Sequence, residues 1–192
     1  MALETVPLEH LPDPYSVHVG FFRSVRNAPH LHAQLLARNA DFEYALIDAS
    51  VIVSRTHLLS AVFKAVNSDI EGELRTPNVH SEIVTGLSAS SNIAEAYRRF
   101  GITKDTKDLL VVKVTKNHEP PAVVIGKHLS ANVEGEQVDV TDEDIEAVTD
   151  LSKVAKYYKL NGLSWFDGIK DKTAKRKELE MLVLGSMALR GV

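Results

Sequence analysis

Two neighbouring residues of the sequence, Gly126 and Lys127, are the ones whose types and order come closest to a known catalytic motif, a phosphate-binding loop. That loop needs an earlier glycine, where this chain has Pro121, and a serine or threonine after the lysine, where it has His128. The glycine and histidine motifs of dinucleotide-binding enzymes, α/β-hydrolases, zinc proteases and protein kinases are also missing. We therefore expect no catalytic residues and no cofactor.

The histidines and carboxylates do not form a clear metal or acid–base site. His30 and His32 are two residues apart, a spacing that places them on different faces of a helix and argues against joint metal binding. The acidic cluster between Asp142 and Glu146 is typical of a helix start, where the helix dipole stabilises negative charge. We expect no metal site.

Basic residues offer a second kind of chemistry, the binding of phosphate groups. Lys64 lies opposite the apolar side of its predicted helix, Arg75 precedes a turn, and Arg98 and Arg99 lie off the apolar face of another helix. These four side chains could form a local phosphate-binding patch, or they could be ordinary solvated charges.

A lysine-rich run precedes the last helix. Its position at a helix start is unfavourable for cations, so it is either a solvated entry to the helix or a contact for an acidic partner. The run consists of Lys170, Lys172, Lys175, Arg176 and Lys177.

The last helix, predicted from about Lys172 to Arg190, carries more apolar residues than one buried stripe can hold. One stripe contains Leu179, Leu182, Val183, Met187 and Leu189. Met181 and Leu184 fall on other parts of the circumference. Either the helix is enclosed within the domain or its second face docks on a protein partner.

Composition limits the class of protein. The chain has 192 residues, 44% of them hydrophobic, a formal net charge of −4 and no cysteine. Such a chain can form one domain with one core, so we predict a single domain over residues 1–192. A reducing compartment, cytoplasm or nucleus, is expected, and no apolar run is long enough for a membrane span.

The elements that must position these residues alternate between strand and helix. After an extended, proline-containing lead at 1–14, strands are predicted at 15–25, 46–53 and 109–115, with shorter extended pieces at 71–76 and after Gly135. Helices are predicted at 27–38, from Ser54 or Thr56 to about 66, and at 78–87, 92–100, 122–131 and 172–190. An acidic helix start is predicted at 141–144, followed by a segment with Tyr157 and Tyr158 that ends near Asn161 and Gly162. The expected fold class is α/β (mixed α+β), a compact domain with a small mixed sheet flanked by helices.

Individual positions carry sharper expectations. Asn27 and Asn92 are predicted helix caps, and Gly101 a helix stop. In the helix after Ser54, the buried stripe is predicted to contain Leu58, Leu59, Val62, Phe63 and Val66. His57 should then face water or a partner, as should Lys64.

Several segments resemble one known family. The stretches ALIDASVIV, HLLSAVFKAV, LRTPNVHSEIVTGLSASSNIAEAYRRFGI and LLVVKV are similar to the PRPK-binding protein (TPRKB) family, the kinase-binding subunits of the KEOPS (also EKC) complex. The similarity is closest over 46–114 and continues in VEGEQVDV and KVAKYYKL, while the start and the lysine-rich region are less distinctive. A fungal member is expected.

The resemblance implies a non-catalytic subunit that binds the small kinase/ATPase of KEOPS directly and its catalytic subunit only through that kinase. The complex transfers a threonylcarbamoyl group to the adenosine beside the anticodon of tRNA, and the family helps to recruit tRNA by its 3′ CCA end and acts as an allosteric effector. A location in nucleus and cytoplasm, with a possible telomeric role on chromosomes, is implied as well.

These implications assign roles to particular residues. Kinase docking is assigned to the last helix, through Met181, Leu182, Leu184 and Met187, and tRNA binding to Lys64, Arg75, Arg98 and Arg99. If its side of the helix is exposed, Leu184→Glu should abolish kinase association and leave the fold intact. The alternative is a small enzyme with an unrecognised active site, which would need carboxylates and histidines to converge in a pocket.

Overall fold

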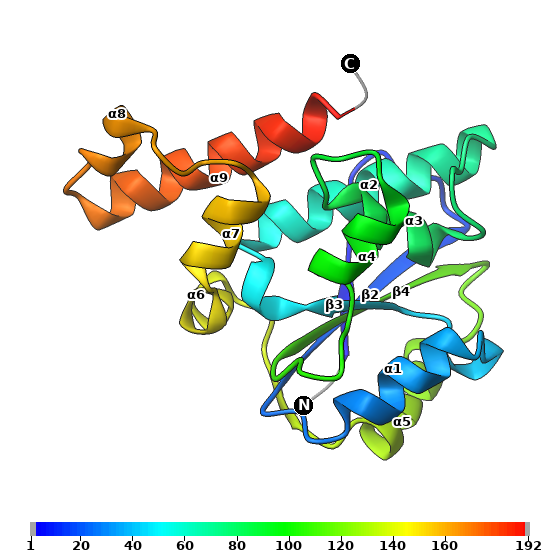
Figure 1. Cartoon of the computed structure of the whole chain (residues 1–192). Helices are drawn as coiled ribbons and strands as arrows, with labels where there is room; N and C mark the ends of the chain where they lie inside the picture. Colours follow the sequence, from blue (N-terminus) through cyan, green and yellow to red (C-terminus); the bar gives the residue numbers. More distant parts are fainter. Residues whose placement is uncertain (1–2, 191–192) are drawn as a thin grey trace.

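A five-stranded sheet with helices on both faces forms the framework of the chain, seen here in a computed structural model that describes residues 3–190 (Figure 1). The strands are β1 (Glu4–Val6), β2 (Tyr15–Arg23), β3 (Ala45–Asp48), β4 (Leu109–Lys116) and β5 (Glu136–Val138). The helices are α1 (Ala28–Leu36), α2 (Arg55–Glu71), α3 (Val79–Gly86), α4 (Ile93–Phe100), α5 (Ala122–Asn132), α6 (Asp142–Val148), α7 (Leu151–Tyr157), α8 (Ser164–Asp167) and α9 (Lys172–Ala188). Short 3-10 turns, η1 (Ala40–Phe42) and η2 (Ala49–Val51), flank β3. The predicted fold class, α/β with a small sheet flanked by helices, is confirmed.

The sheet is antiparallel rather than mixed as predicted. Its strand order is β1-β2-β4-β3, and β5 pairs with the end of β2. Every pair formed by these described strands runs antiparallel. The direction of a strand depends on which strands become neighbours, and the local periodicity of the sequence does not carry that information.

Both faces of the sheet are covered, which explains the unbroken apolar run at the start of β4. Val17, Val19 and Phe21 of β2 face the core beneath α2, α3 and the later helices, whereas Phe22 faces a second core under α1 and α5. The neighbouring residues of β4 alternate in the same way, and all are buried. Alternation of apolar and polar residues is therefore not needed here.

The predicted extended lead contributes an edge strand. β1 pairs with β2, with Thr5 opposite His18. The Glu4 carboxylate forms a two-pronged ion pair with the Arg55 guanidinium, at 2.8 Å for both contacts, which holds β1 to the start of α2. Met1 and Ala2 of the lead lie outside the described residues.

Two local predictions are wrong because side-chain hydrogen bonds to another element replace the expected local structure. Asn27 makes no cap bond to α1; its amide donates to the Asn132 carbonyl (2.7 Å) and accepts from the Glu134 N–H (3.0 Å). Residues 71–76 form no strand, because the Glu82 carboxylate accepts the backbone N–H groups of residues 75 and 76 and the Thr76 hydroxyl. The partners of Asn27 are more than 100 residues away, whereas Glu82 lies in the following helix.

His57, predicted to face water, is completely buried. Its Nδ1 accepts from the Val53 N–H (3.2 Å) and its Nε2 lies 2.8 Å from the Tyr158 hydroxyl, which donates to the Leu87 carbonyl. Burial lowers the pKa of His57 to about 3 and raises the pKa of Tyr158 well above its usual value. Lys64, on the same helix, is exposed as predicted.

The predicted cap of α4 is confirmed, and its removal should be measurable. The Asn92 side chain accepts from the Glu95 N–H (3.0 Å), which satisfies one otherwise unpaired donor at the helix start. We expect Asn92→Ala to lower the free energy of unfolding by about 1 kcal/mol in urea denaturation. Asn92→Asp keeps an acceptor and should retain most of that stability; an equal loss in both variants would contradict the capping role.

Gly101, the predicted stop of α4, is needed for space rather than for an unusual backbone angle. Its φ is −74°, which any residue can adopt. A Cβ at this position would lie 2.7 Å from the Tyr97 carbonyl oxygen. The chain can therefore turn from α4 to the edge of β3 only with glycine here.

Candidate functional site

The outer side of α9 carries the exposed apolar residue Met181, and exposed Leu189 follows directly at the end of the helix. Asp171 caps the helix by accepting from the Ala174 N–H (2.7 Å). Leu179, Val183 and Met187 then face inward and join the main core, where α9 packs against α2. The opposite side of α9 faces away from the sheet, at the top of Figure 1.

The last two turns of this outer side form what we call the outer α9 strip, made of Met181, Gly185, Ala188 and Leu189. Their spacing of three and four residues places them on one helix face. Met181 is 61% and Leu189 68% exposed, and nothing lies within 4 Å of a Cβ built on Gly185. The strip is thus flat in the middle, with one large apolar side chain on each side.

The structure separates the four predicted docking residues. Met181 lies in the outer α9 strip, and Leu184 is half-buried beside it. Met187 is a core residue with 5% exposure, and Leu182 packs against the core. Leu189, predicted to be buried, is exposed instead, because the buried face is centred on Val183 and Leu189 lies about 120° around the helix from it. The sequence therefore identified the helix but missed three of the four strip residues.

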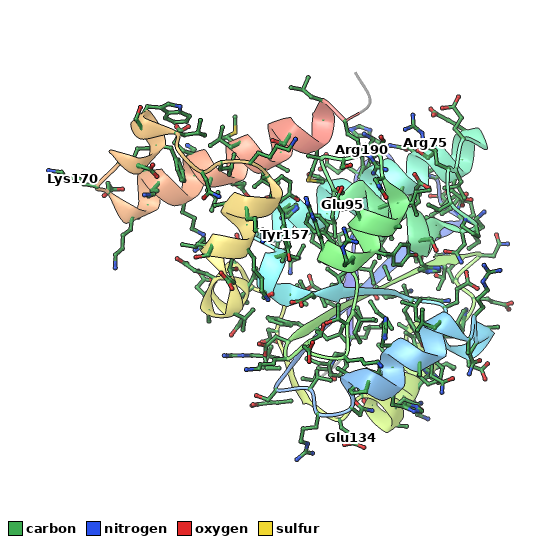
Figure 2. All side chains as sticks on the ribbon, viewed as in Figure 1. Arg75, Glu95, Glu134, Tyr157, Lys170 and Arg190 are labelled. Atoms are coloured by element: carbon green, nitrogen blue, oxygen red, sulfur yellow. The ribbon has the colours of Figure 1, made fainter. Side chains whose placement is uncertain are left out.

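A second feature is a cavity of about 420 Å³ between α2, α3 and the end of α9. We call it the α2–α3 cavity. Three cations line it, Lys64, Arg75 and Arg190, together with three carboxylates and several polar groups. Figure 2 shows Arg75 and Arg190 on the same side of the molecule. The other lining residues include Phe63, Asn67, Ser68, Glu71, Glu73 and Glu82.

From the sequence, only Lys64 and Arg75 of this lining were assigned to a binding site; Phe63 and Arg190 are two further lining residues. Phe63 was assigned to a buried stripe but is 37% exposed at the cavity wall. The Arg190 guanidinium donates to the Thr85 carbonyl at the end of α3, while its Nε–H is buried without a partner. Burial lowers the pKa of Arg190; the Glu82 carboxylate opposes this shift, and the Arg75 charge adds to it.

Arg98 and Arg99, the other half of the predicted tRNA-binding set, lie apart from this cavity on α4. Arg99 forms an ion pair with Glu95, one turn earlier, and its guanidinium carbon lies 5.1 Å from the centre of the Tyr157 ring (Figure 2). Arg98 is exposed. The structure thus brings Lys64 and Arg75 together and places the two α4 arginines elsewhere.

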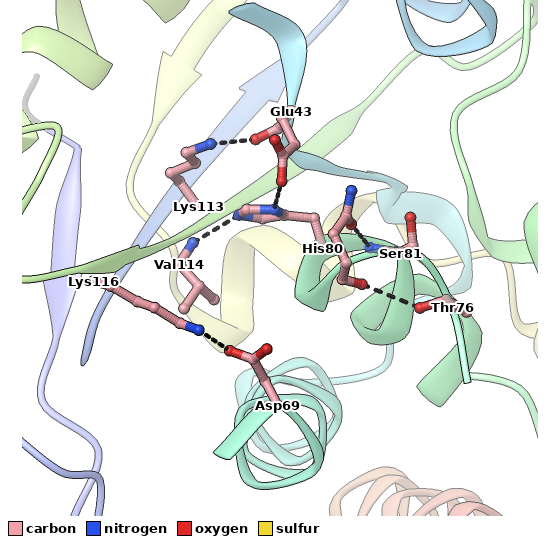
Figure 3. A network of polar contacts seen from close by, with 9 residues as sticks. Glu43, Asp69, Thr76, His80, Ser81, Lys113, Val114 and Lys116 are labelled. Atoms are coloured by element: carbon pink, nitrogen blue, oxygen red, sulfur yellow. Dashed lines mark hydrogen bonds and ion pairs between the residues drawn. The ribbon is translucent and has the colours of Figure 1, made fainter. Parts of the chain in front are cut away.

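A polar network fixes α3, which supplies one wall of the cavity, to the sheet (Figure 3). The His80 Nε2 accepts from the Val114 N–H (3.0 Å), and its Nδ1 lies 3.3 Å from the Glu43 carboxylate. Lys113 donates to the Glu43 carbonyl (2.6 Å). Burial lowers the pKa of His80, although the hydrogen bond to Glu43 acts in the opposite direction. His80 therefore serves as a neutral structural bridge.

The alternative of a small enzyme would need carboxylates and histidines to converge in a pocket. The cavity lining contains carboxylates but no histidine, and both His57 and His80 are engaged in structural hydrogen bonds. Within residues 3–190, no group of three histidine or acidic side chains could hold a metal ion. No helix in that range is long and apolar enough to cross a membrane.

Comparison with known proteins places the chain in a family. Residues 22–191 match the family model "Kinase binding protein CGI-121". An EKC/KEOPS complex subunit CGI121 from Gibberella zeae is 61% identical, and one from Neurospora crassa is 46% identical, each with 100% of both chains covered. A relative from Schizosaccharomyces pombe with the same description is 30% identical over 91% of this chain and 93% of its own length. The predicted resemblance is confirmed, and the chain belongs to the CGI-121 kinase binding protein family.

Proposed function

We propose that this chain is a non-catalytic accessory subunit of an EKC/KEOPS complex and that it docks the small kinase/ATPase of that complex through α9. The single observation that carries the docking site is the outer α9 strip, an apolar surface with open space at Gly185. Exposed apolar patches rimmed by polar residues are typical of protein interfaces. Of the residues that the sequence assigned to docking, Met181 lies in the strip and Leu184 is half-buried beside it, while Leu182 and Met187 pack toward the core.

The same proposal includes tRNA. The chain would help to recruit tRNA, including its 3′ CCA end, for threonylcarbamoylation of the adenosine beside the anticodon, and would act as an allosteric effector of the kinase. Contact with the catalytic subunit would be indirect, through the kinase. We further propose a location in nucleus and cytoplasm, with a chromosomal role at telomeres as an extension.

Co-purification tests the proposal directly. The chain and the small kinase from the same source are mixed at micromolar concentration and passed over a size-exclusion column at moderate salt. A stable complex of fixed stoichiometry is expected. Two separate peaks would overturn the docking proposal and return attention to the enzyme alternative, for which turnover of nucleotide or tRNA by the pure chain would be the positive result.

Charge reversal can show which pair of basic residues contacts tRNA, Lys64 with Arg75 or Arg98 with Arg99. We expect Lys64→Glu with Arg75→Glu to weaken tRNA binding at least tenfold and to reduce the slope of log affinity against log salt by about 1.5, as for the loss of two phosphate contacts. Arg98→Glu with Arg99→Glu changes the charge equally and should have a smaller effect, because Arg99 is already paired with Glu95. Filter binding over a range of salt measures both. Unchanged affinity and slope in both double variants would show that the basic residues are misassigned.

A further inference from the structure

Arg190 lies between the outer α9 strip and the α2–α3 cavity. It directly follows Leu189, the last residue of the outer α9 strip, which is 68% exposed. Its side chain turns inward to the Thr85 carbonyl and lines the α2–α3 cavity with Lys64 and Arg75. One residue thus connects the end of the docking helix to the cationic cavity.

The chemistry of the cavity favours an anion with several acceptor oxygens. Its cations come from three separate segments: α2, the loop before α3, and the end of α9. The Arg190 Nε–H is a buried donor without a partner, so a small movement of this side chain that brings the donor to an acceptor in the cavity would be favourable. A phosphate group can accept from several guanidinium and ammonium donors at once.

The carboxylates in the cavity do not all oppose such an anion. One oxygen of Glu82 already accepts three hydrogen bonds from the backbone and hydroxyl donors of residues 75 and 76. This carboxylate therefore fixes the loop that carries Arg75. Glu71 and Glu73 are exposed, so solvent screens their charges.

Without an anion, Arg190 is held near the like charge of Arg75. An anion between them would remove this repulsion and fix the end of α9 to α3. The adjacent residues Ala188 and Leu189 would then be held in place for a partner that binds the strip. Coupling of this kind must be reciprocal, so a docked partner would tighten anion binding by the same factor.

We propose that Arg190 binds a phosphate group in the α2–α3 cavity and thereby couples phosphate binding to docking of the kinase on the outer α9 strip. The inference rests on the proposed function, because it needs the kinase to dock on α9. It assigns to Arg190 a positioning role for the kinase as well as a direct role toward phosphate.

The first experiment uses the full chain alone. Inorganic phosphate is titrated at constant ionic strength against chloride, while NMR follows the arginine Nε–H signals. The Arg190 signal should move in a saturable way, with an Arg190→Gln variant used for its assignment. A linear, unsaturable drift would mean that the cavity does not bind phosphate and would overturn the proposal.

The second experiment measures kinase affinity by calorimetry with and without saturating phosphate, and then with tRNA in place of phosphate. Phosphate should tighten kinase binding by about fivefold for the wild type, at the lower end of typical coupling, and by less than about twofold for Arg190→Gln. Arg190→Lys keeps the charge and should restore part of the effect. Lys172→Gln removes an exposed cation at the other end of α9 and should respond like the wild type.

The outcomes distinguish the two proposals. If the NMR shift is saturable but kinase affinity does not respond, coupling through Arg190 is wrong while docking stands. If kinase binding is indifferent to changes in the outer α9 strip, docking itself is misplaced, and the phosphate site remains testable on the chain alone. A response to tRNA but not to inorganic phosphate would place the RNA contact outside the cavity and overturn the role of Arg190.

Discussion

Gly185→Arg should prevent kinase binding at micromolar concentration and leave the chain at least as stable as the wild type. Nothing lies within 4 Å of a Cβ at this position, so the new side chain meets no neighbour within the molecule. Arginine is also a better helix former than glycine, by up to about 1 kcal/mol. In a complex, however, the arginine would occupy the flat centre of the outer α9 strip and separate the two surfaces. A loss of more than about 2 kcal/mol in binding free energy, roughly 30-fold, is expected.

The matched control for this variant is Ala174→Arg. Ala174 is also exposed and lies on the same side of α9, about three turns earlier and outside the strip. Calorimetry gives the kinase affinity and thermal unfolding gives the stability of each variant. Wild-type affinity for Gly185→Arg with an intact fold would exclude the strip as the docking surface. Leu184→Glu, suggested by the sequence, is a poorer test because Leu184 is half-buried and its replacement would also affect stability.

Mild acid should destabilise the chain through His57. Its folded pKa is lowered to about 3 by burial, against an ordinary value near 6.5 in the unfolded chain. Below pH 6.5 the unfolded state binds a proton that the folded state does not, so the free energy of unfolding must fall as pH falls. The expected slope is about 1.4 kcal/mol per pH unit, or about 2 kcal/mol between pH 6.5 and 5. The lowered pKa values of His18 and His80 act in the same direction.

Urea denaturation from pH 7.5 to 5 measures this slope, and NMR shows whether the His57 ring stays neutral in the folded state. Its proton should be on Nε2, because Nδ1 accepts from the Val53 N–H. Titration of His57 near pH 6.5 in the folded chain would contradict the prediction. Tyr158→Phe provides an independent check: it leaves the His57 Nε2–H and the Leu87 carbonyl unpaired and should cost about 1–3 kcal/mol at pH 7.5.

Elements with local signals were predictable from the sequence. The strand at Leu109 and the helices that follow Ser54, Asn78 and Asn92 agree with the structure, since caps and apolar periodicity act within a few residues. Predictions failed where a polar side chain has a distant partner. The buried state of His57, for example, depends on Tyr158, 101 residues away.

The candidate site was predictable to a smaller extent. The sequence places Lys64 away from the apolar face of its helix and Arg75 before a turn, so both could be expected at the surface. Whether they come together depends on how α2 and α3 pack. On α9, the number of apolar residues correctly indicated that one buried face does not hold them all, since Met181 is exposed. The phase of the buried face is set by packing against α2 and the core, which buries Met187 and leaves Leu189 exposed. A glycine on an exposed helix face, such as Gly185, was the one local signal that could have located the strip.

The imidazole of His80 also protects the chain from self-association. β3 begins at Ala45, opposite Val112, so residues 113–116 of β4 extend beyond it and pair with no described strand on that side. The N–H of Val114 at that edge is taken by His80, a side chain that cannot extend a ladder to another molecule. A subunit that is synthesised before it meets its partners would otherwise carry a template for strand addition. The same bridge that orders α3 thus leaves the Val114 N–H unavailable to a strand of another molecule.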